Sequence, residues 1–185
     1  MLKFEEIDET DINWIIRETA LHLTSGQYIE DLIRKSINEG NYYGVKALNG
    51  NEKAGFLTFK HGIEFTYPHP KLESKIARMV PVNKVFSGDG IYVRQSIRRG
   101  GIGTEMTRMA RDMMKKLGGE YFLGEPWVYP DGRRPSETPT AGYGETVYEE
   151  YVPYFYKDNS RYGLACAVCG TECRCGAVVR LVKLS

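Results

Sequence analysis

A turn rich in glycine and arginine follows an apolar segment near the middle of the chain. The segment is Ile91-Tyr92-Val93, the turn is Arg98-Arg99-Gly100-Gly101-Ile102-Gly103, and helical apolar spacing begins at Thr104. Glycines let the backbone approach an anion closely, and the free N–H groups of a helix start point towards it. The arginines, Arg94 included, can add charge-assisted hydrogen bonds to phosphate. These residues therefore predict a phosphate-binding turn.

The spacing of the glycines excludes the two commonest phosphate loops. A Walker loop needs Gly-Lys-Ser/Thr after its spacer, and the chain has no such pattern. A dinucleotide fingerprint needs Gly-x-Gly-x-x-Gly, but Met106 stands where the third glycine would be. The turn therefore suits a phosphate-bearing ligand of another kind.

The four cysteines form a second group that can do chemistry, because all of them lie between residues 166 and 175. They are Cys166, Cys169, Cys173 and Cys175, and Gly170 follows the Cys-x-x-Cys pair. Four thiolates suit tetrahedral zinc, which predicts a structural zinc knuckle at residues 163–176. The Cys-x-Cys half departs from a standard zinc ribbon. A redox pair and four reduced, metal-free thiols are the alternatives.

Composition limits the class of protein. The 185 residues suit one domain of residues 1–185, with 42% hydrophobic and 26% charged side chains. The net charge of +1 gives no reason to expect nucleic acid or an anionic membrane as a partner. No apolar run reaches the ~20 residues that span a bilayer, and the N-terminus lacks a signal-peptide core. A cytoplasmic protein is therefore expected.

Apolar periodicity predicts the elements that position these residues. Strands are expected at residues 2–7, 42–48, 54–60, 85–93, 120–128, 145–153 and 177–184, and helices at 12–23, 25–37, 72–79 and 104–117. Asn49-Gly50-Asn51 is a hairpin signal, and residues 62–67 continue the third strand or begin another. The cysteines lie between the last two strands.

The strand, turn and helix together resemble the acetyl-CoA motif, Arg/Gln-x-x-Gly-x-Gly/Ala, of the GCN5-related N-acetyltransferase (GNAT) family. The order of elements, with an aromatic turn at residues 154–158, extends this resemblance over the whole chain. It implies an α/β fold with a mostly antiparallel, twisted central sheet of about seven strands flanked by helices.

The resemblance also implies a coenzyme site. The backbone of the motif strand pairs with the pantetheine arm, and the turn surrounds the pyrophosphate at the helix N-terminus. The expected coenzyme-binding residues are Ile91, Tyr92, Val93, Arg98, Arg99, Gly100, Gly101, Ile102, Gly103 and Thr104. The N–H group of Val93 is the candidate that polarises the thioester carbonyl.

Acetyl transfer also needs a base for the amine and an acid for the departing thiolate. Period-two counting places Asp89 on the same strand face as Ile91 and Val93, which makes it the first candidate base, with Glu64 as the alternative.

The tyrosine that many family members use as the acid corresponds to Thr138 in this sequence. Tyr156 and Tyr143 are therefore the nearest candidate acids.

The function expected from this resemblance is transfer of the acetyl group of acetyl-CoA to a primary amine of a small molecule, peptide or protein. The amine would attack directly in a ternary complex, and the resemblance is compatible with a homodimer. The alternative is an acetyl-CoA-binding regulatory or interaction module with a zinc-stapled hairpin and little catalytic activity.

Overall fold

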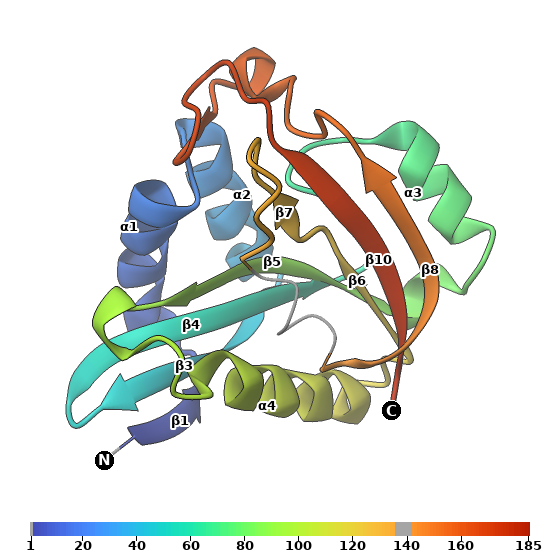
Figure 1. The fold of residues 1–185 in the computed structure, drawn as a ribbon. Helices are drawn as coiled ribbons and strands as arrows, with labels where there is room; N and C mark the ends of the chain where they lie inside the picture. The colour runs from blue at the N-terminus through green and yellow to red at the C-terminus, as the bar shows by residue number, and fades with distance from the viewer. Residues whose placement is uncertain (1, 136–141) are drawn as a thin grey trace.

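The apolar strands assemble into one twisted sheet that runs through the molecule (Figure 1). The computed structural model describes residues 2–135 and 142–185. The strand order is β1-β3-β4-β5-β6-β10-β7, and β8 pairs with β10. The strands are β1 (Leu2–Glu6), β3 (Tyr43–Asn49), β4 (Glu52–His61), β5 (Val85–Val93), β6 (Tyr121–Gly124), β7 (Trp127–Val128), β8 (Gly144–Val152) and β10 (Gly176–Leu184).

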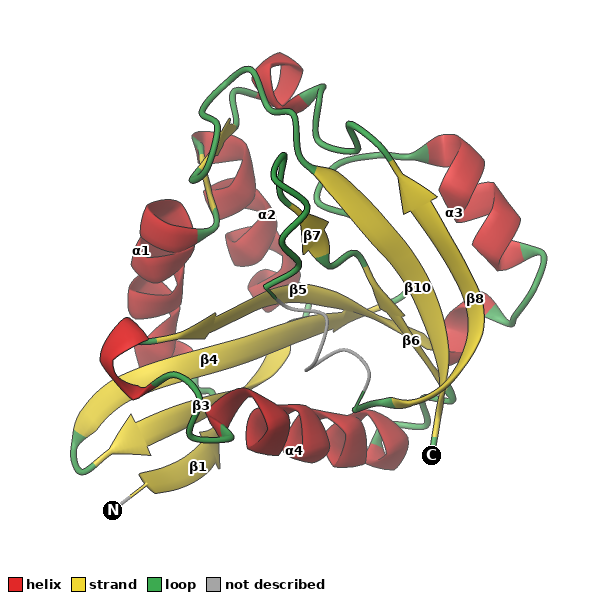
Figure 2. Ribbon diagram, in the orientation of Figure 1, coloured by secondary structure: helices red, strands yellow, loops and turns green. Residues whose placement is uncertain are grey.

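Helices cover both faces of this sheet (Figure 2). They are α1 (Ile12–His22), α2 (Gln27–Asn38), α3 (Pro70–Ala77) and α4 (Ile102–Lys116), with 3-10 turns at Glu9–Asp11, Val82–Lys84, Gln95–Ile97 and Asn159–Tyr162. Helices α1 and α2 bury Ile15 and Ile33 against Phe56 on one face. Helix α4 buries Met106 and Met114 on the other face. The apolar stripe of each helix is therefore the side that packs against the sheet.

The two central strands β5 and β6 separate along their length. They form the one parallel pair among the described strands, and their pairing covers only Val85–Ser87 of β5. Beyond Ser87, β5 keeps β4 as an antiparallel partner up to Val93 and has an open edge on its β6 side. Backbone groups on an open edge are available to a ligand.

The prediction that Asp89 lies on the same strand face as Ile91 and Val93 is wrong, because β5 contains a bulge at Asp89. The register with β4 shifts so that Thr58 opposes Gly90 and Phe59 opposes Gly88, which leaves Asp89 as the extra residue. A bulge breaks the alternation of faces. Asp89 consequently contacts Tyr42 and Thr58 on the α1–α2 side. The side chain of Ile91 packs on the α4 side.

The expected mixed, mostly antiparallel fold is confirmed, with small differences in its elements. Residues 62–67 form no strand. The strand expected at residues 120–128 is two strands, β6 and β7, separated by Glu125 and Pro126. Proline lacks the N–H group that would continue the ladder. None of the described helices is long and apolar enough to cross a membrane.

A second, two-stranded sheet ties the cysteine segment to the N-terminal helices. Strand β9 (Ala165–Cys166) lies between β8 and β10 in sequence and pairs with β2 (Thr24–Ser25), which connects α1 to α2. In Figure 1 this segment lies above α1 and α2, near the start of β10.

Candidate active site

A cavity of about 630 Å³ opens where β5 and β6 separate. Its lining includes Ile102 and Thr107 of α4 on one face of the sheet and Thr19 and His22 of α1 on the other. The cavity therefore reaches both faces through the gap between the two strands. Nine of the ten residues predicted to bind coenzyme line it, and the tenth, Gly100, is exposed on the turn beside it.

The turn before α4 has the backbone of an anion site. Gly101 precedes the helix with φ of 75°, and Arg99 has φ of 71°, which is uncommon for a residue with a side chain. In the described part of the chain no side chain caps α4. Its first N–H groups are therefore left for water or a ligand. A Cβ atom at Gly101 would meet nothing within 4 Å beyond its chain neighbours, so the space beside this glycine is open.

The three arginines in and before the turn differ in whether their side chains reach the cavity. Arg98 and Arg99 line the cavity, and Arg98 Nε donates a hydrogen bond to the Val93 carbonyl at 2.8 Å. Arg94 instead binds the β3–β4 hairpin, with its guanidinium 2.7 Å from both the Glu52 carboxylate and the Lys53 carbonyl. Arg94 is therefore occupied elsewhere, and two arginines remain at the cavity.

A buried lysine holds the first candidate base in an ion pair. Lys60 Nζ lies 2.8 Å from Asp89 Oδ1 and 3.7 Å from Glu64 Oε2, and all three residues line the cavity. Burial alone would lower the pKa of Lys60, but the two carboxylates outweigh it and the pKa is raised. The other Asp89 oxygen accepts hydrogen bonds from Tyr42 and Thr58. Both oxygens of Asp89 are therefore engaged.

Glu125, which directly follows β6, is a carboxyl group that the sequence interpretation missed. The residue is half-buried where it borders the cavity, but its Oε2 atom is fully buried with no hydrogen-bond partner in the described part of the chain. Oε1 accepts hydrogen bonds from the Thr66 N–H, at 3.0 Å, and from the Thr66 hydroxyl. Burial raises the pKa of Glu125 to about 7. The available sequence signal was an acidic residue next to Pro126 inside the strand expected at residues 120–128.

Both tyrosines named as candidate acids lie at the cavity and are buried. The Tyr156 hydroxyl donates to the Glu125 carbonyl at 3.0 Å, and burial raises its pKa well above the usual range. Tyr143 stacks on Phe122 with ring centroids 3.8 Å apart, and burial raises its pKa also. Both phenols therefore keep their protons at neutral pH. Thr138 lies outside the described residues.

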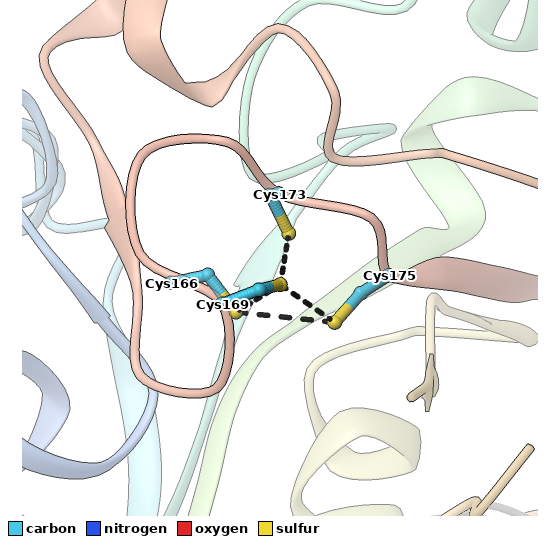
Figure 3. Close-up of side chains that lie close together, drawn as sticks. All are labelled: Cys166, Cys169, Cys173 and Cys175. Carbon is cyan, nitrogen blue, oxygen red and sulfur yellow. Dashed lines mark hydrogen bonds between the residues drawn. The ribbon is translucent and has the colours of Figure 1, made fainter. Parts of the chain in front are cut away.

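The four cysteines converge in space (Figure 3). Cys169 Sγ lies 3.4 Å from Cys173 Sγ, 3.5 Å from Cys175 Sγ and 3.7 Å from Cys166 Sγ, and all four sulfurs lie within 4.8 Å of one another. A tetrahedron with Zn–S bonds of ~2.3 Å has sulfurs about 3.8 Å apart. The cluster contains no disulfide, so all four thiols are available. Its donor set fits a tetrahedral metal ion.

Backbone N–H groups donate hydrogen bonds to two of the cysteine sulfurs, as they do in a zinc knuckle. Val168 N–H donates to Cys166 Sγ, and Arg174 N–H donates to Cys169 Sγ, each at 3.4 Å. Gly170, with φ of 69°, closes the turn by exchanging hydrogen bonds with Cys166. Burial raises the pKa of the Cys175 thiol. A nearby cation would oppose this effect.

No protein-family model matches the sequence. No curated protein is significantly similar to it in sequence. Similarity is found among solved structures. NAA60 of Arabidopsis thaliana in complex with acetyl-CoA is 12% identical with a TM-score of 0.69, covering 99% of this chain and 98% of that one.

Two bacterial structures are also similar to this chain over its whole length. An N-acetyltransferase of Staphylococcus aureus Mu50 is 13% identical, with a TM-score of 0.61 and coverage of 100% and 99%. The ribosomal-protein-S18-alanine N-acetyltransferase of Escherichia coli is 14% identical, with a TM-score of 0.60 and coverage of 100% and 95%. The chain therefore has the fold of the GNAT N-acetyltransferases, as its sequence predicted.

Proposed function

We propose that this protein is an acetyl-CoA-dependent N-acetyltransferase that acts on a primary amine in a ternary complex. The observation that carries the proposal is one continuous cavity lined both by the uncapped N-terminus of α4 and by Glu125, whose pKa burial raises to about 7. A phosphate-bearing coenzyme and an amine need these two environments within one cleft.

The coenzyme half consists of β5, the turn and the start of α4. Bound acetyl-CoA would supply an activated acetyl thioester. The open edge of β5 offers backbone groups to the amide-containing arm, and Val93 N–H is our candidate for polarising the acetyl carbonyl. The N–H groups around Gly101 would bind the pyrophosphate, with Arg98 and Arg99 beside it.

In the acceptor half, Glu125 is our candidate for the general base. A base must take a proton from the bound ammonium, and efficiency is greatest when its pKa lies near the working pH. The pKa of Glu125, raised by burial to about 7, meets this requirement, and its Oε2 accepts no hydrogen bond from the described part of the chain. Asp89 is held by Lys60, Tyr42 and Thr58, which favours a role in fixing that lysine.

Tyr156 remains our candidate for the acid that protonates the thiolate of coenzyme A. It lines the cavity, keeps its proton because of burial, and is linked to Glu125 through that residue's carbonyl. The acid and the base would thus be fixed relative to each other by one hydrogen bond.

We also propose that the four cysteines hold a structural zinc ion. Four protein ligands leave no open position for substrate, so the ion would serve the fold rather than the chemistry. Protein purified without chelator is expected to contain about one zinc per chain by elemental analysis. Less than about 0.2 zinc per chain would reject the site.

Release of free thiol from acetyl-CoA over a panel of amines tests the proposed activity. One similar structure is a ribosomal-protein-S18-alanine N-acetyltransferase, so the panel should contain peptides with free N-termini besides lysine peptides and small amines. We expect amine-dependent turnover with at least one class. Tight binding of acetyl-CoA without any turnover would favour the alternative of a coenzyme-binding interaction module.

A further inference from the structure

The cysteine knuckle, residues 163–176, makes direct backbone contact with one wall of the cavity. Thr24 of β2 pairs with the metal-ligand candidate Cys166, and Ala167 N–H donates to the Leu23 carbonyl at 3.0 Å. His22, Leu23 and Thr24 line the cavity on the face that also holds Lys60 and Asp89. We call these three residues the acceptor wall, a name that rests on the proposed function.

A second contact joins the knuckle to the candidate base. The Cys175 carbonyl accepts a hydrogen bond from Tyr156 N–H at 3.4 Å, and the Tyr156 hydroxyl donates to the Glu125 carbonyl at 3.0 Å. Cys166, Cys173 and Cys175 are buried in the same apolar cluster as Tyr156. Two of the four cysteines are thus within one or two hydrogen bonds of the acceptor half.

The coenzyme half belongs to a different part of the core. Ile91, Val93 and Ile97 pack with Ile102 and Met106 in an apolar cluster that contains none of the cysteines. A change in the knuckle therefore reaches the acceptor wall directly. It reaches β5 through that wall, where His22 stacks on Tyr92 with ring centroids 4.7 Å apart.

We propose that a metal ion bound by the knuckle fixes the acceptor wall, so that metal occupancy controls the amine side of the cleft and leaves the phosphate-binding turn before α4 intact. The knuckle is a loop of 14 residues whose sulfurs would be crowded together without a cation between them. Metal loss frees Cys166 from the cluster, and the pairing between β9 and β2 then loses its anchor. The linker between α1 and α2 consequently opens.

Gly26 offers a way to separate the linker from the knuckle without touching a cysteine. It follows β2 with φ of 143°, and an added Cβ would lie 2.5 Å from the Gly163 carbonyl oxygen and 3.0 Å from a methyl group of Leu164. Gly26→Ala must therefore push the linker and the knuckle apart. Gly40→Ala is the control for a glycine substitution beside α2, because Gly40 lies beyond the other end of the helix with open space around it. Its φ of 67° strains alanine less than the φ of 143° at Gly26 does.

Hydrogen exchange measured by mass spectrometry, metal analysis and acetyl-CoA calorimetry test the proposal. In Cys169→Ala/Cys173→Ala, which removes two ligands, we expect peptides covering residues 22–26 to exchange about tenfold faster or more. Peptides from α4 should change less than about twofold, and acetyl-CoA affinity should stay within about twofold of native. Gly26→Ala should reproduce the local effect with the metal retained, and Gly40→Ala should not.

Three results would overturn the proposal. They are unchanged exchange at residues 22–26 after metal loss, equal acceleration in α4, and a parallel loss of acetyl-CoA affinity. Where an amine substrate is found, the KM for that amine should rise in Gly26→Ala while the KM for acetyl-CoA does not. Absence of turnover in the native protein would count against the proposed function alone, since the exchange and calorimetry results do not depend on catalysis.

Discussion

Glu125→Gln is expected to lower kcat about 100- to 1,000-fold and to leave acetyl-CoA affinity within about twofold of native. Glutamine has nearly the shape of glutamate, and its carbonyl oxygen can still accept the hydrogen bonds that Thr66 gives to Oε1. It cannot accept a proton from the amine. Steady-state thiol release at saturating amine, with calorimetry for the coenzyme, measures both quantities.

The pH dependence of kcat makes this prediction specific to a base. Burial raises the pKa of Glu125 to about 7, so in the native protein kcat should rise with pH through an acid limb at or below this value. A bound ammonium would favour the carboxylate and move the limb lower. Glu125→Gln should lack the limb. The glutamine amide does not titrate, so no acid limb at a different pH should appear in place of the one that is lost.

Asp89→Asn tests which of the two candidate carboxylates at the cavity, Asp89 or Glu125, acts as the base. It leaves the ammonium group of Lys60 buried with a weaker partner, so a lower melting temperature is expected. The acid limb should remain. Loss of the limb in Asp89→Asn together with its persistence in Glu125→Gln would return the base to Asp89, as the sequence first suggested.

The difference between these two residues shows what could be predicted from the sequence. The strand, turn and helix from Val85 to Lys116 depend on local signals, namely apolar spacing and glycines that permit positive φ. The face of Asp89 depends on a bulge that exists only in the pairing of β5 with β4. Counting along β5 alone could not reveal it.

Pairing between strands that are far apart in the sequence explains why the other features of the site were not predicted. Glu125 enters the cavity because β6 lies parallel to β5 and then diverges from it, which no feature of β6 itself specifies. The cysteine spacing indicated a metal site, but it could not show that Ala165 would lie against Ser25, 140 residues earlier. Residues whose chemistry needs a neighbour from another strand are therefore the ones that sequence reasoning misses or misplaces.

Gly101→Glu is expected to weaken acetyl-CoA binding by a factor of about 100 or more, because it introduces a negative charge where the pyrophosphate is proposed to bind. The new carboxylate would also accept hydrogen bonds from the free N–H groups of α4 and so compete with the phosphates. The fold should tolerate it, because a Cβ atom at Gly101 meets nothing within 4 Å. The positive φ of 75° adds backbone strain of about 1 kcal/mol.

Gly118→Glu controls for that strain and for the added charge. Gly118 follows the other end of α4 with φ of 85° and equally open space, and it does not line the cavity. Both variants should stay folded, with Gly118→Glu the less stable of the two because its carboxylate lies at the negative end of the helix dipole. Only Gly101→Glu should lose coenzyme affinity in calorimetry. Equal affinities in the two variants would mean that the turn before α4 is not where phosphate binds. The coenzyme half of the proposed function would then be wrong, whatever the fold.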